Sequence, residues 1–166
     1  MSLLNSKFDI QSVDNPLAVA ALAQVLEVLN PPALGTNGTP QPGTIPPGAI
    51  VKMDTSTGKA VLASTPDIST SANVVLPFVT IDGNMDYSGS FVEKITVFAG
   101  GYTMVTDQYD LNGGSFTLGA PVTFLNGKVI PMTNKVTQQL FGFVGPKGLD
   151  ATAGTLQVIV PQGAGI

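Results

Sequence analysis

Short apolar segments separated by turn residues fill residues 49–161, and they restrict the possible fold more than any other feature of the chain. No helical period interrupts these segments, and short strands that recur in this way are typical of antiparallel barrels and sandwiches. We therefore expect a mainly β protein, with a small antiparallel β-barrel or sandwich as its body. The expected strands are residues 49–54, 59–63, 73–81, 90–98, 102–106, 121–125, 128–132, 140–144 and 155–160.

The turns between these segments predict how some strands are joined. The Asn126-Gly127 pair is the strongest short hairpin signal in the chain, because Asn and Gly tolerate the positive φ angles of a two-residue turn. Residues 55–58, Thr-Ser-Thr-Gly, predict a second hairpin. Residues 99–101, Ala-Gly-Gly, predict another tight turn, and the nearly continuous apolar run at 73–81 favours a buried strand.

An N-terminal arm, residues 1–30, precedes the strands and carries a predicted helix. Residues 14–16, Asp-Asn-Pro, form a helix start with a capping residue before proline, and residues 30–32, Asn-Pro-Pro, end it. The run from Leu17 to Leu29 is so apolar that a helix there must be covered on most sides, by its own domain, by a second copy or by a different protein. The candidate protein contacts on this arm are Leu17, Leu22, Val25, Leu26 and Leu29.

A Pro/Gly-rich linker, residues 31–48, joins the arm to the β-domain at 49–166. Ten of the 19 residues at 30–48 are Pro or Gly, a composition that favours extended chain spanning on the order of 50 Å at about 3.1 Å per residue. The linker either carries the arm to an adjacent subunit or wraps on its own domain. The apolar run of 13 residues is shorter than the roughly 20 residues of a membrane-spanning helix, so we expect no membrane partner and no signal peptide.

The composition argues against catalysis and for assembly. The 166 residues include no His, Cys, Arg or Trp, which removes the commonest general base, the most easily activated nucleophile and the usual anion-binding side chain. We expect no enzyme, no catalytic residues and no cofactor. Only 11% of the residues are charged, and so weakly charged a surface is typical of oligomers and larger assemblies. A net charge of −4 with singly spread lysines gives no basic stripe, so we expect no nucleic-acid partner.

One stretch has the spacing of a metal site. Residues 82–93 place oxygen side chains at alternating positions and end on Glu93, as in an EF-hand calcium loop. Tyr87 occupies the position that needs glycine, and a polar turn between two strands would contain the same residue types. We therefore expect no metal site.

The order of turns and apolar pairs is similar to that of a known family. The arm leads into a segment from Gly48 to Val61, which is followed by Gly119-Ala120-Pro121-Val122, by Asn126-Gly127-Lys128-Val129 and by a strand containing Gly142. Over residues 47–145 this pattern resembles the capsid decoration, or cement, proteins of tailed bacteriophages.

The resemblance implies a structural protein on the outer surface of an expanded icosahedral capsid. Its implied partners are the major capsid protein and further copies of itself, as a homotrimer, with terminal arms that bridge neighbouring capsid subunits. Its implied location is the virion surface, after assembly in the host cytoplasm. Two alternatives stay open: another virion component such as a fibre, tail or minor shell protein, and a non-viral ligand-binding β module.

Overall fold

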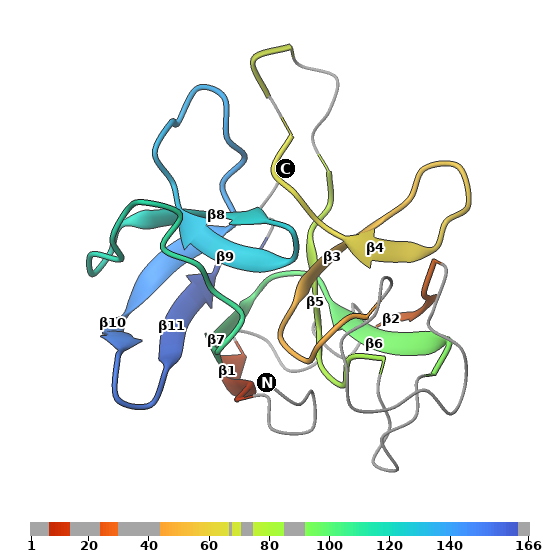
Figure 1. Cartoon of the computed structure of the whole chain (residues 1–166), viewed down its shortest axis with the longest axis horizontal. Coiled ribbons are helices and arrows are strands. Elements are labelled where there is room, and N and C mark those ends of the chain that lie inside the picture. Colours follow the sequence, from red (N-terminus) through yellow and green to blue (C-terminus); the bar gives the residue numbers. More distant parts are fainter. Residues whose placement is uncertain are drawn as a thin grey trace.

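Two antiparallel sheets lie side by side and make up the body of the protein (Figure 1). The computed structural model describes residues 7–13, 24–29, 44–66, 68–70, 75–84 and 92–162. Within these residues the only helix is one 3-10 turn, η2 (Ile68–Thr70), and neither sheet closes into a barrel. The expectation of a mainly β, antiparallel fold is confirmed.

The first sheet has six strands, drawn on the left of Figure 1, and several strands that are neighbours in the sheet are not consecutive in the sequence. Burial alternates along β7, where Tyr102, Met104 and Thr106 are buried and the residues between them are half-buried, as a strand with one covered face requires. The strands, in sheet order, are β1 (Asp9–Val13), β7 (Tyr102–Thr106), β11 (Thr155–Val160), β10 (Gly142–Asp150), β8 (Pro121–Leu125) and β9 (Lys128–Pro131).

The second sheet has five strands, and part of it is covered on both faces. Ile50 and Val79 belong to the core shared with the first sheet, whereas Val51 and Phe78 belong to a second core. Burial on both faces explains the continuous apolar runs in these strands, and it confirms the buried strand expected within 73–81. The strands, in sheet order, are β2 (Gln24–Glu27), β6 (Lys94–Phe98), β5 (Phe78–Thr80), β3 (Ile50–Met53) and β4 (Ala60–Leu62).

Both predicted hairpins are confirmed, and the third turn has a different role. β3 pairs with β4, and β8 pairs with β9 across Asn126-Gly127. Residues 99–101 also form a tight connection, but β6 lies in the five-stranded sheet and β7 in the six-stranded sheet. This turn therefore passes the chain from one sheet to the other. Turn residues specify a reversal of the chain and leave open which strand becomes the neighbour.

The predicted N-terminal helix is wrong where the structure describes it. Residues 24–27 form strand β2, which pairs with β6 from Gln24–Val97 to Glu27–Lys94. A short apolar run is compatible with either a helix or a strand, and here hydrogen bonding along β6 decides in favour of the strand. The earlier part of the predicted helix, residues 17–23, lies outside the described residues.

The end of the predicted linker packs on the body of the fold. Ile45 is buried, and its amide donates to Asn84 Oδ1 at 2.8 Å while its carbonyl accepts from the Asn84 amide at 2.9 Å. The Gly48 amide donates to the Thr80 carbonyl at 2.7 Å. Residues 44–48 are thus held by the five-stranded sheet, whereas residues 31–43 of the linker lie outside the described residues.

Candidate interaction surface

The predicted contact residues that the structure describes do not share one face. Leu17 and Leu22 lie outside the described residues. Leu26 is only 9% exposed and belongs to the second core, Leu29 is half-buried, and Val25 is 66% exposed. The reason is the strand period of two, which directs neighbouring side chains to opposite faces. Among these three side chains, Val25 is the most exposed and is accessible for contact with another molecule.

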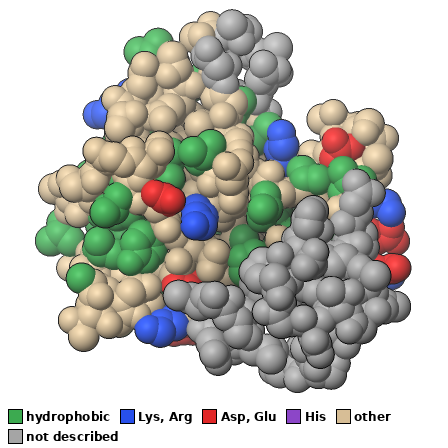
Figure 2. Space-filling view, in the orientation of Figure 1, with side chains coloured by type: hydrophobic (Ala, Val, Ile, Leu, Met, Phe, Trp, Pro, Cys, Tyr) green, Lys and Arg blue, Asp and Glu red, His purple; other side chains and the backbone are tan. Residues whose placement is uncertain are grey.

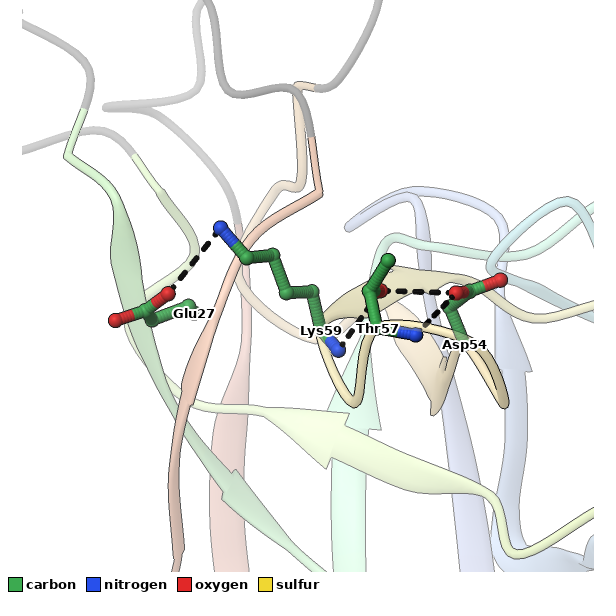
Figure 3. A network of polar contacts seen from close by, with 4 residues as sticks. All are labelled: Glu27, Asp54, Thr57 and Lys59. Atoms are coloured by element: carbon green, nitrogen blue, oxygen red, sulfur yellow. Dashed lines mark hydrogen bonds and ion pairs between the residues drawn. The ribbon is translucent and has the colours of Figure 1, made fainter.

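Strand β2 is attached to the β3–β4 hairpin as well as to β6. Val28 forms a parallel bridge with Ala60, and the Leu29 amide donates to the Ala60 carbonyl at 2.9 Å. Beside these backbone contacts, Lys59 Nζ lies 3.2 Å from Glu27 Oε2 (Figure 3). Both side chains of this ion pair are substantially exposed, so it contributes little to stability. Backbone pairing therefore holds β2 in place.

A single carboxylate oxygen organises the turn of that hairpin. Asp54 Oδ1 accepts hydrogen bonds from the amides and the hydroxyl groups of Ser56 and Thr57, at 2.6–3.2 Å. Thr57 Oγ1 in turn accepts from the Lys59 amide at 3.3 Å, which joins the turn to the ion pair (Figure 3). The hydroxyl groups of Ser56 and Thr57 lower the pKa of Asp54 below its usual 3.8, because they stabilise the charged form. The turn is therefore rigid and negatively charged.

A groove of about 320 Å³ opens beside this turn, at the end of β3. Val51 pairs with Phe78, and Met53 and Leu76, each two residues beyond that pair along its own segment, both form part of the wall of the groove. Both of these side chains are 43% exposed. Val75, Thr55 and Gly58 complete the wall, with Lys52 and Asp54 as its charged groups. The groove is mainly apolar and has one charge of each sign.

Residues 133–138 form a compact loop beside the segment that lines the groove. Asn134 Oδ1 accepts from the amides of Val136 and Thr137, and Gln138 Oε1 accepts from those of Thr133 and Asn134. These bonds fix the loop from inside, yet Val136 is 72% exposed. An apolar side chain presented on a rigid loop is suited to binding, since little conformational entropy is lost when it is buried.

Gln139 ties this loop to the groove segment. Its side-chain amide pairs with the backbone of Val75, with Val75 N donating to Oε1 at 3.0 Å and Nε2 donating to the Val75 carbonyl at 2.6 Å. Its own amide donates to Thr65 Oγ1, and its carbonyl accepts from Thr123 Oγ1 in β8. The Val136 loop and the groove are therefore neighbours on one molecule.

Exposed apolar side chains occur on several separate elements. Val25 lies on β2, Val136 on the 133–138 loop, and Leu118, 62% exposed, on the segment before β8. Charged side chains are few and scattered on the face drawn in Figure 2. Sequence reasoning missed Leu118, Val136, Met53 and Leu76. The available signal was an isolated apolar residue between turn residues, as in Thr117-Leu118-Gly119.

Two described oxygen-bearing side chains of the calcium-like stretch, Asp82 and Asn84, bind protein groups. Asp82 accepts from the amide and the hydroxyl group of Thr96, at 2.9 and 3.1 Å, and Asn84 Oδ1 accepts from Ile45. Residues 85–91 lie outside the described part of the chain. Among the residues that the structure does describe, no three His, Cys, Asp or Glu side chains are grouped as a metal ion would require.

The part of the chain described by the structure contains no helix with the length and apolar character needed to cross a membrane. Comparison with known proteins found no match to a protein-family model, to a curated protein or to a solved structure.

Proposed function

We propose that this chain is a structural protein that binds the outer surface of an icosahedral viral capsid as a decoration, or cement, subunit. The observation that carries the proposal is the set of strongly exposed apolar side chains on separate elements, Val25, Leu118 and Val136, in a chain with only 11% charged residues. The two sheets form a sandwich-like body that holds these contact points apart. The major capsid protein is the proposed partner, together with further copies of this chain.

The proposed mechanism is multivalent attachment. Each exposed side chain can contribute only a modest contact, but several contacts on one particle act together once the first has formed. A subunit that binds the assembled shell and has little affinity for its separate parts stabilises the shell by mass action. Such a subunit needs a rigid body with several contact points, which two packed sheets supply.

The fold determines how the contribution of the N-terminal arm to binding can be tested. Strand β1 is an edge strand of the six-stranded sheet, and β2 is an edge strand of the five-stranded sheet. Strand β1 pairs with β7. Just before it, the Lys7 amide donates to Asp107 Oδ2 and the Lys7 carbonyl accepts from the Asp107 amide. Removing the arm would therefore remove two strands along with any contact that the arm makes. Substitution of Val25 tests the arm without this damage, because its side chain points away from the second core.

The first experiment is to count this chain in purified particles from its source, by quantitative mass spectrometry against the major shell protein. We expect hundreds of copies at a simple ratio to the shell protein. A few dozen copies or fewer would replace the proposal with a fibre, tail or minor shell role. Complete absence would overturn the virion assignment and leave a ligand-binding β module.

The second experiment measures binding of the purified chain to particles that lack it. We expect Val25→Asp and Leu118→Asp each to weaken binding by about tenfold or more, as for a contact in a buried interface. Thr152→Asp, which introduces the same charge at an exposed position of the turn between β10 and β11, is the control. Equal binding by both variants and the control would contradict the proposed contact points.

A further inference from the structure

The Val136 loop and the groove beside the β3–β4 turn are both apolar and exposed. One presents a single projecting valine on a fixed loop, and the other offers an open apolar space between Met53 and Leu76. The volume of about 320 Å³ is larger than one valine side chain, so the groove can take Val136 together with part of its loop. Figure 2 shows green side chains at the right of the view, close to blue and red ones, beside the tan surface of the turn.

A charged residue lies beside each of these two features. Lys135 precedes Val136 and is exposed. Asp54 and Lys52 both line the groove, and the four hydrogen bonds that Asp54 accepts from its turn all end on Oδ1, which leaves Oδ2 able to accept from a cation. A valine seated between Met53 and Leu76 would bring the neighbouring lysine to the side of the groove where this carboxylate lies.

The described residues of the chain do not fill the groove. Gln139 holds the loop against Val75, yet Val136 remains 72% exposed and Leu76 is 43% exposed. The loop is braced by four hydrogen bonds from backbone amides to its own side chains, so it cannot fold over onto the groove without losing them. The described part of the molecule therefore leaves the groove open to a second molecule.

We propose that Val136 of one copy inserts between Met53 and Leu76 of a second copy, with Lys135 placed against Asp54. Every copy carries both the projecting loop and the groove as neighbours, so a symmetric pair forms the same contact twice. The proposal does not depend on capsid binding. Self-association is measured on the purified chain alone, and particle binding is measured separately, so the failure of one leaves the other standing.

The test is the mass of the purified full-length chain across the micromolar range, by sedimentation velocity and light scattering. We expect concentration-dependent association that Val136→Asp and Leu76→Asp each weaken at least about tenfold, because each places a charge in an apolar contact. Leu111→Asp, at an exposed leucine outside both the groove and the loop, is the matched control and should associate as the unaltered chain does. Lys135→Glu should weaken association less, and more strongly at low salt than at high salt.

A mixture of the two variants separates a contact from a general effect. Val136→Asp keeps an intact groove and Leu76→Asp keeps an intact loop, so together they can form one complete contact that neither forms alone. We expect the mixture to associate more tightly than either variant. A monomeric unaltered chain, no recovery in the mixture, or equal weakening by Leu111→Asp would each overturn the proposal. Near-UV circular dichroism establishes that both variants are folded, and Met53→Asp replaces Leu76→Asp if the latter is not.

Discussion

The turn of the β8–β9 hairpin and the turn of the β3–β4 hairpin are built alike and placed differently. Each contains a glycine with positive φ, 77° at Gly127 and 70° at Gly58. A Cβ atom at Gly127 would lie 2.5 Å from Leu62 Cδ2 and 3.3 Å from the Ile50 carbonyl oxygen, whereas one at Gly58 would have nothing within 4 Å. One turn is buried against the other sheet, and the other is open to solvent.

The buried turn connects the two sheets. The Ile50 amide donates to the Gly127 carbonyl at 2.8 Å, and the Gly127 amide donates to the Ala63 carbonyl at 2.8 Å. Ser64 and Asn126 add two side-chain hydrogen bonds to this connection, which we call the joint between the sheets. The open turn instead forms its bonds within itself, to Asp54. The same turn chemistry therefore reverses the chain in one place and joins two sheets in another.

Substitution of the two glycines should give the largest difference in stability between variants of the two turns. Gly58→Ala places a residue with a side chain at a positive φ angle and adds no contact, so we expect it to lower the free energy of unfolding by about 1 kcal/mol. Gly127→Ala also forces its methyl group against Leu62 and the Ile50 carbonyl, and we expect a loss of about 3 kcal/mol in the free energy of unfolding. Urea denaturation of both variants measures the difference.

A double substitution tells which part of that loss is steric. Leu62 is partly exposed, so Leu62→Ala alone should cost little, and it removes the nearest atom from the added methyl group. We expect Leu62→Ala with Gly127→Ala to recover about 1 kcal/mol relative to the sum of the single changes. Strict additivity would mean that backbone conformation alone accounts for the difference between the turns.

The turn between the sheets, residues 99–101, adds a buried group with no counterpart in either hairpin turn. Tyr102 begins β7 directly after it, is fully buried, and has no hydrogen-bond partner for its hydroxyl group among the described residues. Burial raises the pKa of Tyr102 far above its usual value. Tyr102→Phe removes a desolvated hydroxyl, so we expect unfolding to cost about 1 kcal/mol more. A thermal melt measures this, and a destabilised variant would show that the hydroxyl group does have a partner.

Two serines allow a milder comparison of the same turns. Ser64 Oγ accepts from the Asn126 amide at 3.0 Å and lies 3.1 Å from Asn126 Oδ1, across the joint between the sheets. Ser56 Oγ donates to Asp54 at 2.6 Å within the exposed turn. We expect Ser64→Ala to destabilise by about 1 kcal/mol and Ser56→Ala by less. The reverse order in urea denaturation would argue against Ser64 as part of the joint.

The smallest effect should appear only in acid, at the open turn. Hydrogen bonds from Ser56 and Thr57 hold the pKa of Asp54 below 3.8 in the folded protein. The charged form is thereby favoured on folding, so its contribution to stability is present above pH 3.8 and is lost as the pH falls through the lower folded pKa. We expect the difference in unfolding midpoint between the unaltered chain and Asp54→Asn to shrink below pH 3.8. A difference that is constant with pH would contradict this role.

The fold class and both hairpins followed from the sequence because their signals are local. Asn126 and Gly127 adopt φ angles of 49° and 77°, which few other residue pairs tolerate, so the pair itself specifies the reversal. Continuous apolar residues around Phe78 likewise require burial on both sides. The candidate site was predicted less well, since Val25 alone proved to be exposed among the three predicted contact residues that the structure describes.

The tertiary structure alone decided the rest. Residues 24–27 form a strand because β6 offers them a hydrogen-bonding edge. The local sequence of the arm does not indicate that this edge is present. Residues 99–101 connect two sheets because β7 pairs with β1 and β11, strands far away in the sequence. Gln139 places Val136 beside the groove through bonds to Val75. Turns depend on the backbone angles of a few adjacent residues, whereas strand neighbours and surface grooves depend on distant residues competing for the same hydrogen bonds and the same space.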